Sequence, residues 1–363
     1  MKLKRFLCLL CVLACLLPAG CGNGAGSAVS SEPAGSSAQG AASSEEEPPL
    51  PEGPDGVNPL TGEPMEACYE TARPTAVMLN NLKAAQPQLG VSRADLIYEV
   101  VAEGGITRML AVYQTLEGVE NLGSIRSTRP YYLELALGHD ALLAHAGGSP
   151  EAYADIQAWG VDNMDGVNGG SDAKIFWRDP ERRKKAGYEH SMLTSGAEIK
   201  AYAEEHFRTE HAQDYQEGLR FAAQGSSADG GSPAAHVSVR FSNYKTGTFD
   251  YQPAEQTYWV GQYGDAYRDG NNDEQVAVSN LLVLETAIST ISGDTAGRQQ
   301  VRLSGEGSGT LYSGGCAIPI RWSKSARSQP FTYTTEDGRP LELRRGTSYI
   351  CIISPKTSSV TVS

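Results

Sequence analysis

Four polar residues, Arg126 to Arg129, stand directly before Pro130, and proline is well suited to the first position of a helix. The N-terminus of a helix offers free N–H groups and a partial positive charge. The guanidinium groups of Arg126 and Arg129, with the hydroxyl of Ser127, therefore predict a site for a carboxylate or phosphate, or for an acidic partner.

A second turn with similar features is formed by Gly147, Gly148 and Ser149, directly before Pro150. Glycines in such a turn let the backbone approach a ligand closely. Because both turns connect a predicted strand to a predicted helix, we expect them to open on one edge of a sheet, where α/β folds usually bind ligands. Arg108 and Arg178 are expected to add positive charge there.

Catalysis is an alternative to binding. Glu103, His145 and His190 carry side chains that serve as general acid and base, so an envelope hydrolase or transferase is the rival hypothesis. The chain lacks the G-x-S-x-G and H-E-x-x-H patterns, and its single C-x-x-C pair falls within the first 20 residues. We therefore expect a protein that is not an enzyme, without a metal or a cofactor.

A purely structural role for the same residues stays open. In this interpretation Arg108, Arg126 and Arg129 pair with Asp95, Glu99 or Glu103 across the sheet. Ser149 only caps a helix, the two glycines only permit the turn, and His145 is a core histidine with satisfied hydrogen bonds. For each residue alone the structural interpretation is slightly favoured. For the cluster as a whole the sequence favours a pocket for a ligand or partner.

Alternating strand-like and helix-like runs from Asn58 to residue 224 predict a mixed α/β domain. Helices are predicted from Pro130 to Gly138, from Pro150 to Trp159, and after the capping pattern Ser195–Glu198. The predicted strands are 75–79, 96–102, 107–114 and 141–146.

The Gly/Ser-rich stretch 225–233 reads as a linker to a smaller all-β domain, a sandwich or barrel, over 234–363. Its predicted strands are 236–241, 257–260, 276–284, 299–303, 310–312, 318–322 and 349–353. The acidic stretch Asp269–Asp273 is interpreted as a solvated turn rather than a calcium loop. Cys316 and Cys351 share this domain, either as a disulfide or as buried thiols.

The N-terminus has the pattern of an exported lipoprotein. Three basic residues precede a twelve-residue apolar run, too short to span a bilayer, and small residues then lead to Cys21. This predicts a signal peptide over 1–20, lipidation of Cys21, and a flexible acidic tether up to residue 57. The whole chain has 30 basic and 43 acidic residues, a net charge of −13, which argues against nucleic acid as a partner.

Many motifs in order resemble the YerB-like lipoprotein family. They are Asn58–Gly62, Arg73-Pro74 with Asn80, Asp95–Glu99, Glu103–Arg108, Ile125–Tyr131, His145–Pro150, Asp165-Gly166, Phe176–Arg178 and His190-Ser191. The resemblance extends over most of 58–353 and includes the division into two domains. It implies an uncharacterised Gram-positive envelope lipoprotein at the outer face of the cytoplasmic membrane. We expect it to be anchored through Cys21 and to meet a partner in the cell wall or envelope.

Overall fold

The computed structural model describes residues 55–363. The predicted signal peptide, the lipidated Cys21 and nearly all of the predicted tether lie outside these residues. Gly56–Val57, assigned above to the end of the tether, form strand β1 and pair with β2 (Pro64–Met65). Within residues 55–363 no helix is long and apolar enough to cross a membrane.

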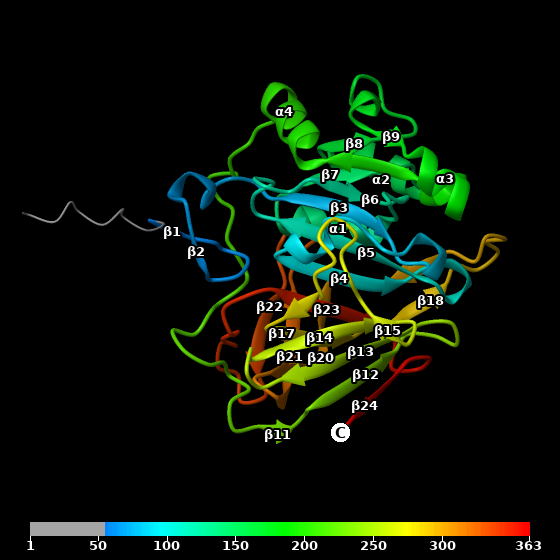
Figure 1. Cartoon of the computed structure of the whole chain (residues 1–363). Helices are drawn as coiled ribbons and strands as arrows, with labels where there is room; N and C mark the ends of the chain where they lie inside the picture. Colours follow the sequence, from blue (N-terminus) through cyan, green and yellow to red (C-terminus); the bar gives the residue numbers. More distant parts are fainter. Residues whose placement is uncertain (1–54) are drawn as a thin grey trace, which may run out of the picture. The chain divides into compact units, whose positions relative to one another are not determined.

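The centre of the fold is one 11-stranded sheet, which contains strands from both halves of the chain (Figure 1). In spatial order its strands are β11 (Ser232–Pro233), β21 (Cys316–Lys324), β20 (Gly305–Ser313), β17 (Asn280–Glu285), β23 (Ser348–Ile353), β4 (Leu96–Val101), β5 (Thr107–Tyr113), β3 (Thr75–Asn80), β7 (Leu142–His145) and β8 (Asn163–Asp165), with β22 (Thr332–Thr335) beside β21.

Strand directions bring several chain segments to one edge of this sheet. Strands β3, β7 and β8 are parallel, and β4 runs in the same direction because β5 lies antiparallel between β4 and β3. The ends of β3, β4, β7 and β8 therefore meet the beginning of β5 at a single edge. The two predicted turns, before Pro130 and Pro150, lie at this edge, as expected.

Four α-helices are present in the described part of the chain: α1 (Pro130–Gly138), α2 (Pro150–Trp159), α3 (Pro180–Ala186) and α4 (Gly196–His206). The predicted bounds of α1 and α2 are confirmed. Ser149 Oγ accepts from Ala152 N at 3.1 Å, and Gly160 ends α2 in the left-handed conformation that favours glycine. The short basic helix α3, capped by Asp179, was not predicted.

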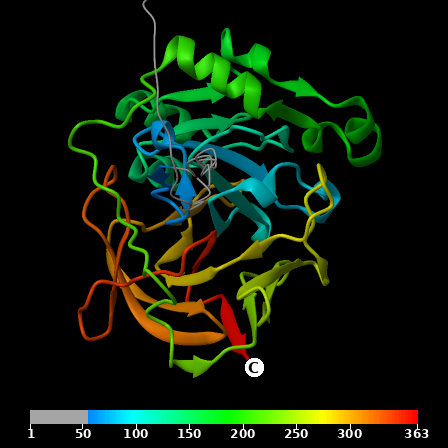
Figure 2. The ribbon, with the colours of Figure 1, turned by 60° about the vertical axis from the view of Figure 1, so that its left-hand side comes forward.

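The two faces of the sheet bury separate apolar clusters. On one face, α1 and α2 pack with Tyr132, Leu133 and Ala152 in the core. The other face is covered by α4, by the small sheet β6–β10–β9, and by a six-stranded sheet (Figure 2). The small sheet contains β6 (Asn121–Gly123), β10 (Met192–Ser195) and β9 (Trp177–Arg178). The six-stranded sheet contains β15 (Asp265–Ala266), β14 (Thr257–Gln262), β13 (Thr246–Gln252), β12 (His236–Arg240), β24 (Ser359–Val362) and β16 (Ala277–Val278).

The C-terminal half consists of strands without an α-helix in the described residues, as predicted. Its remaining hairpin pairs β18 (Ile288–Thr290) with β19 (Gln299–Val301). The two halves nevertheless share hydrogen bonds, because β23 pairs in parallel with β4 through all of Leu96 to Val100. The α/β and all-β parts are thus joined edge to edge through one sheet.

One interpretation of the C-terminal half is wrong, and one open alternative is decided. Asp269 does not lie in a solvated turn: it is 1% exposed, and its carboxylate accepts from Gly90 N at 3.0 Å and from Ser92 N at 2.8 Å. Cys316 and Cys351 are both free thiols. They lie three strand positions apart, on β21 and β23, which is roughly 14 Å at the usual spacing and beyond the reach of a disulfide.

Candidate arginine edge

The functional candidate is the sheet edge predicted above, which we call the arginine edge: Arg108, Arg126, Arg129 and Arg178 with Glu103 and Glu189. Arg108 is the second residue of β5 and lies directly opposite Asn80, the last residue of β3. Glu103 lies in the connection from β4 to β5, and Arg129 is the residue that precedes the first turn of α1.

Glu103 binds two guanidinium groups. Arg108 Nη2 lies 3.1 Å from Glu103 Oε2, and Arg129 Nε donates to the other carboxylate oxygen. Burial alone would raise the pKa of Glu103, but the two guanidiniums outweigh it and hold the pKa below its ordinary value. This carboxylate is therefore ionised at neutral pH, and it is shared between two positive charges.

Arg126 and Arg178 extend the positive charge outward from this pair. Arg126 Nη2 lies 2.7 Å from Glu189 Oε2, which is largely exposed, and this contact lowers the pKa of Glu189. Arg178 donates to the Tyr188 carbonyl at 2.7 Å and stacks on the exposed Tyr188 ring at 3.8 Å. Four arginines therefore adjoin along one contiguous set of contacts.

Hydrogen-bond donors exceed acceptors at this edge. Three guanidiniums share two carboxylates, and Arg178 forms no ion pair with the described residues, in a chain whose net charge is −13. Among the described residues, the buried Nε atoms of Arg108, Arg126 and Arg178 have no acceptor. Unpaired buried donors cost free energy, so the edge is suited to an added acceptor with negative charge.

The glycine turn beside the edge has a clear local role. Thr128 N donates to Gly147 O at 2.9 Å, and Gly147 N donates to Asp165 Oδ1 at 2.8 Å. Gly147 has φ +81°, and a Cβ there would lie 3.3 Å from Ser127 Oγ, so a side chain would be strained. With Gly148 bridged to Thr128 and Ser149 capping α2, the turn holds residues 126–128 in place.

The three predicted catalytic residues, Glu103, His145 and His190, each bind different partners. His145 is fully buried, with Nδ1 2.8 Å from Gly147 O and Nε2 3.0 Å from Asn163 Oδ1, so both ring nitrogens are engaged. His190 Nδ1 lies 2.8 Å from Asn80 Nδ2, at the edge itself. Burial and the nearby Arg126 charge lower the pKa of His190. Glu103 is held by arginines, and within residues 55–363 no hydrogen bond or ion pair joins two of the three residues.

The structure adds residues that sequence reasoning did not place here. Glu189 and Tyr188 follow the basic run of α3, and only their adjacency to His190 pointed to the edge. Asn80 ends β3 and was noted only as part of a motif. Within residues 55–363 no group of three or more His, Cys, Asp or Glu side chains is arranged to hold a metal ion.

Comparison with known proteins agrees with the architecture. Residues 60–211 match the family described as "Protein of unknown function (DUF3048) N-terminal domain", and residues 237–350 match its C-terminal domain. The lipoprotein YerB of Bacillus subtilis (strain 168) is 30% identical over 309 residues, which is 84% of this chain and 88% of the relative.

A solved structure is similar over the same region. The crystal structure of the YerB protein from Bacillus subtilis has a TM-score of 0.71 and 28% identity, and the match covers 85% of this chain and 100% of that one. The motifs, the two matched domains and the shared fold lead to one assignment: the chain belongs to the YerB-like lipoprotein family, whose two domains are those described as DUF3048.

Proposed function

We propose that this lipoprotein is a binding protein rather than an enzyme, and that its arginine edge binds an anionic group carried by a ligand or by an acidic partner protein. We place it at the outer face of the cytoplasmic membrane, anchored through a lipid on Cys21. The natural class of partner at that location is the machinery that builds or remodels the cell wall.

One observation carries the proposal: the edge is short of acceptors for its guanidinium groups. Three of its four arginines have a buried Nε without an acceptor in the described part of the chain. A hydrogen bond between charged groups is worth about 1.5–3 kcal/mol, so a carboxylate or phosphate that supplied the missing acceptors would bind there with useful affinity. Arginine is the side chain best matched to the geometry of such oxyanions.

The anchoring hypothesis fits this role. A diacylglyceryl group on Cys21 would supply two acyl chains, which is enough for stable attachment to a membrane. If residues 22–57 form a flexible chain, their r.m.s. reach is roughly 30–36 Å. The arginine edge would then meet partners near the membrane surface without being held against the lipid.

The test is a comparison of three chains by pull-down from cross-linked envelopes, at low and high salt. The wild-type chain is expected to retain a partner or an anionic wall polymer, and the double variant Arg126→Ala/Arg129→Ala to lose it. Arg321→Ala is the matched control, because Arg321 is exposed on β21, away from the edge. Equal recovery by all three chains would reject the proposal.

The rival function, a hydrolase or transferase that uses Glu103, His145 and His190, is weighed by a separate measurement. Wall fragments are incubated with the wild-type chain and with His190→Ala, and released sugars and peptides are quantified. Activity that depends on His190 would favour the enzyme. Activity that survives both His190→Ala and His145→Ala would remove these residues from it.

A further inference from the structure

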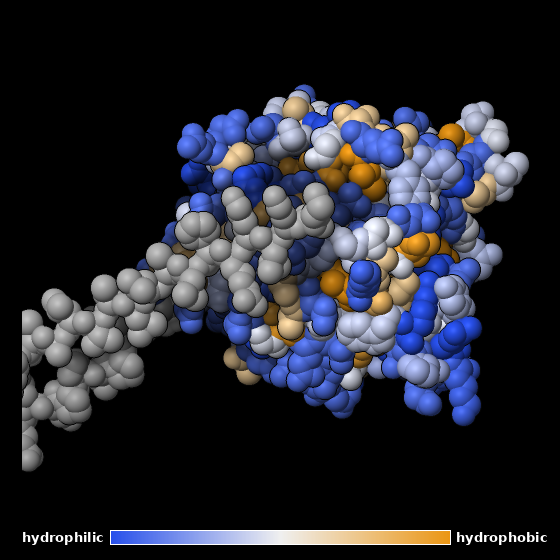
Figure 3. Space-filling view, turned by 90° about the horizontal axis from the view of Figure 1, so that it is seen from above, coloured by the Kyte–Doolittle hydropathy of each residue, from blue (hydrophilic) through white to orange (hydrophobic). Residues whose placement is uncertain are grey.

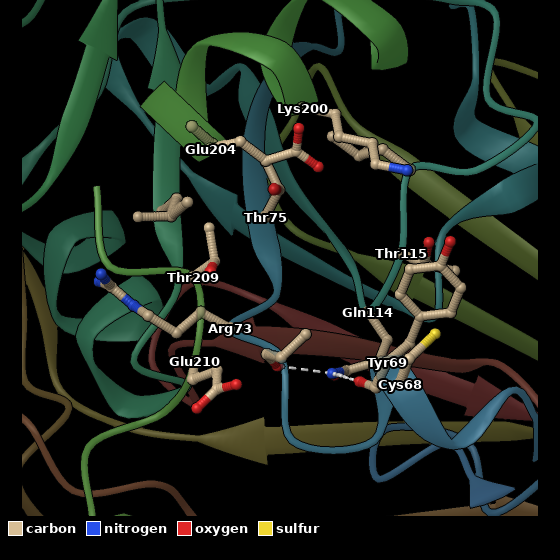
Figure 4. A pocket seen from close by; sticks show the side chains of 14 residues that line it. Cys68, Tyr69, Arg73, Thr75, Gln114, Thr115, Lys200, Glu204, Thr209 and Glu210 are labelled. Carbon is tan, nitrogen blue, oxygen red and sulfur yellow. Dashed lines mark hydrogen bonds between the residues drawn. The ribbon is translucent and has the colours of Figure 1, made fainter. Parts of the chain in front are cut away.

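A cavity of about 230 Å³ lies at the opposite edge of the same sheet, where β3 and β7 begin and β5 ends (Figure 4). It is bounded by Thr75 of β3, by Gln114 after β5, and by Lys200, Ala203 and Glu204 of α4. It shares no lining residue with the arginine edge, and it plays no part in the function proposed above.

The floor of this cavity is apolar. Leu116, Leu142 and Ala203 are each less than a tenth exposed, and all three line it. Such a floor favours a short aliphatic chain, because each buried methylene contributes about 0.8 kcal/mol.

The rim carries two carboxylates that are not neutralised. Glu204 and Glu210 are exposed, and neither side chain makes a hydrogen bond or an ion pair with the described residues. The cations of the lining are already engaged. Lys200 Nζ donates to Glu117 at 2.9 Å, and it points away from Glu204 in Figure 4.

The second lining cation is also occupied. Arg73 Nη1 lies 2.7 Å from Asp162 Oδ2, and Arg73 Nε lies 3.4 Å from Asp140 Oδ1. The unpaired charge of the cavity is therefore negative, and no side chain of the described residues pairs with it.

A buried acceptor without a donor gives an independent indication of the same chemistry. Gln114, 3% exposed, directs Nε2 to the carbonyls of Tyr69 and Ala72, each at 2.7 Å. These two bonds fix the orientation of the amide, and Oε1 is left without a partner among the described residues. Because Gln114 lines the cavity and its Oε1 lacks a donor, the cavity is suited to a ligand that supplies N–H groups.

We infer that this cavity binds a primary ammonium group on a short aliphatic chain, such as the end of a diamino acid or polyamine. The apolar floor takes the methylenes, Glu204 and Glu210 take the charge, and the ammonium supplies the donors that the lining lacks. A carboxylate or phosphate would meet uncompensated glutamates here, and a neutral alcohol would leave their charge unpaired.

Cys68 provides a direct readout of occupancy. It lines the cavity and is exposed, whereas Cys316 is partly buried and Cys351 is buried. The rate of Cys68 alkylation by N-ethylmaleimide is measured on the full mature chain, with Cys68→Ser as background. The probes are butylamine, butanol and butyrate, matched in length and different in charge.

Butylamine is expected to slow alkylation of Cys68 in a saturable manner, whereas butanol and butyrate leave the rate unchanged. Glu204→Gln should weaken the protection by about tenfold or more, the value of one charge-assisted hydrogen bond. Glu205→Gln, an exposed neighbour on α4 that does not line the cavity, should behave as wild type. Ala203→Leu should abolish the protection by filling the floor.

Two results would overturn the inference. One is absence of protection by butylamine, or equal protection by all three probes. The other is unchanged protection in Glu204→Gln. Because Glu204 is exposed, its substitution leaves the core intact, so this second result decides the matter even if Ala203→Leu does not fold.

Discussion

Glu99 and Glu103 lie four residues apart on β4 and the connection that follows it, yet their surroundings differ in one decisive respect. Glu99 is fully buried on the face covered by the six-stranded sheet, and a single cation, Lys245, lies 3.5 Å from it. Glu103 lies at the rim of the sheet and is shared by two arginines.

The Glu99 carboxylate is fully hydrogen-bonded, although Lys245 Nζ makes no hydrogen bond within residues 55–363 and pairs with it by charge at 3.5 Å. Its carboxylate accepts from Asn81 at 2.8 Å, from Thr107 at 2.6 Å and from Tyr349 at 2.5 Å. Tyr349 comes from β23 and Lys245 from the turn before β13, so the network joins the two halves of the chain. The negative charge of Glu99 is balanced by the positive charge of Lys245.

The comparison separates a structural ion pair from a candidate binding site by its charge balance and its exposure. A buried one-to-one pair adds specificity to the fold and offers nothing to a ligand. Two guanidiniums on one carboxylate leave one positive charge over at the rim of the sheet, where the side chains of Arg108, Arg129 and Glu103 are 6%, 11% and 16% exposed. Asp95, at the start of the same strand, is the third case, because no cation lies within ion-pair distance of it among the described residues.

Removal of the Glu99 partner should have the largest effect. Lys245→Ala leaves a buried carboxylate unpaired, and we expect the free energy of unfolding to fall by about 3–5 kcal/mol in denaturant titrations. Lys83→Ala is the control, since the Lys83–Asp265 pair is exposed and 3.5 Å long. A loss no larger than that of the control would show that the network is not structural.

Glu103→Gln should lower stability by less than Lys245→Ala does. It should also strengthen the binding of anions at the arginine edge. Two guanidiniums lose their shared carboxylate, and the expected loss is about 2–3 kcal/mol at low salt, less at high salt. Anion binding at the edge should strengthen, because the local positive charge rises by one. Weaker anion binding in a variant that is still folded would contradict the comparison.

Asp95 predicts a dependence of stability on pH. Burial raises its pKa from 3.8 to about 6, although hydrogen bonds from Gln114 N and Asn58 Nδ2 act in the other direction. The folded chain therefore takes up this proton at a higher pH than the unfolded chain. The stabilisation is present in acid and is lost as the pH rises through about 6.

The measurement is the difference in unfolding free energy between wild type and Asp95→Asn. It should shift by about 2 kcal/mol in favour of wild type when the pH falls from 7 to 4.5. The variant has nearly the same shape and does not titrate, although its amide can accept only one of the two hydrogen bonds from Asn58 and Gln114; this loss is the same at both pH values, and other carboxylates cancel in the difference. A constant difference over this range would show that Asp95 titrates normally in the folded chain.

Arg126→Ala should have the smallest effect on stability, about 1 kcal/mol or less, since its partner Glu189 is exposed. Its effect on retention of an anionic partner should nevertheless be clear in the pull-down above. Thermal unfolding and partner recovery measured on the same preparation separate the two effects. Loss of both together would make Arg126 a structural residue.

Local signals in the sequence were sufficient for much of the fold. Proline at the first helical position predicted the start of α1 and of α2 correctly, and Gly160 predicted the end of α2, because these residues act on their own backbone. Strand β13 was missed: its Gly247 and polar residues weaken the alternating pattern, and β12 and β14 on either side supply its stability.

The site was predictable only in part, for a similar reason. The arginines before Pro130 were found from their position, and the shared edge followed from the order of strands. The pairing of Glu103 with both Arg108 and Arg129 was not predicted, because it depends on side-chain geometry. Asp269 shows the same limit: its burial arises from Gly90 and Ser92, which are distant in sequence.

The face of the molecule seen from above in Figure 3 gives no comparable sign of a binding site. The face in Figure 3 mixes hydrophilic side chains with small hydrophobic patches, without one dominant apolar area. Both candidate sites therefore rest on unpaired polar groups rather than on an exposed apolar surface.

The parallel pairing of β23 with β4 has a consequence for how the protein is made. A chain synthesised from its N-terminus displays one side of β4 as an open backbone edge until β23 is made, and Glu99 lacks its Tyr349 partner for 250 residues. Open edges recruit other chains, and long-range pairing is slow. Folding thus has a vulnerable interval, and a polypeptide that ends before Ser348 would be a target for chaperones and proteases rather than a working half-molecule.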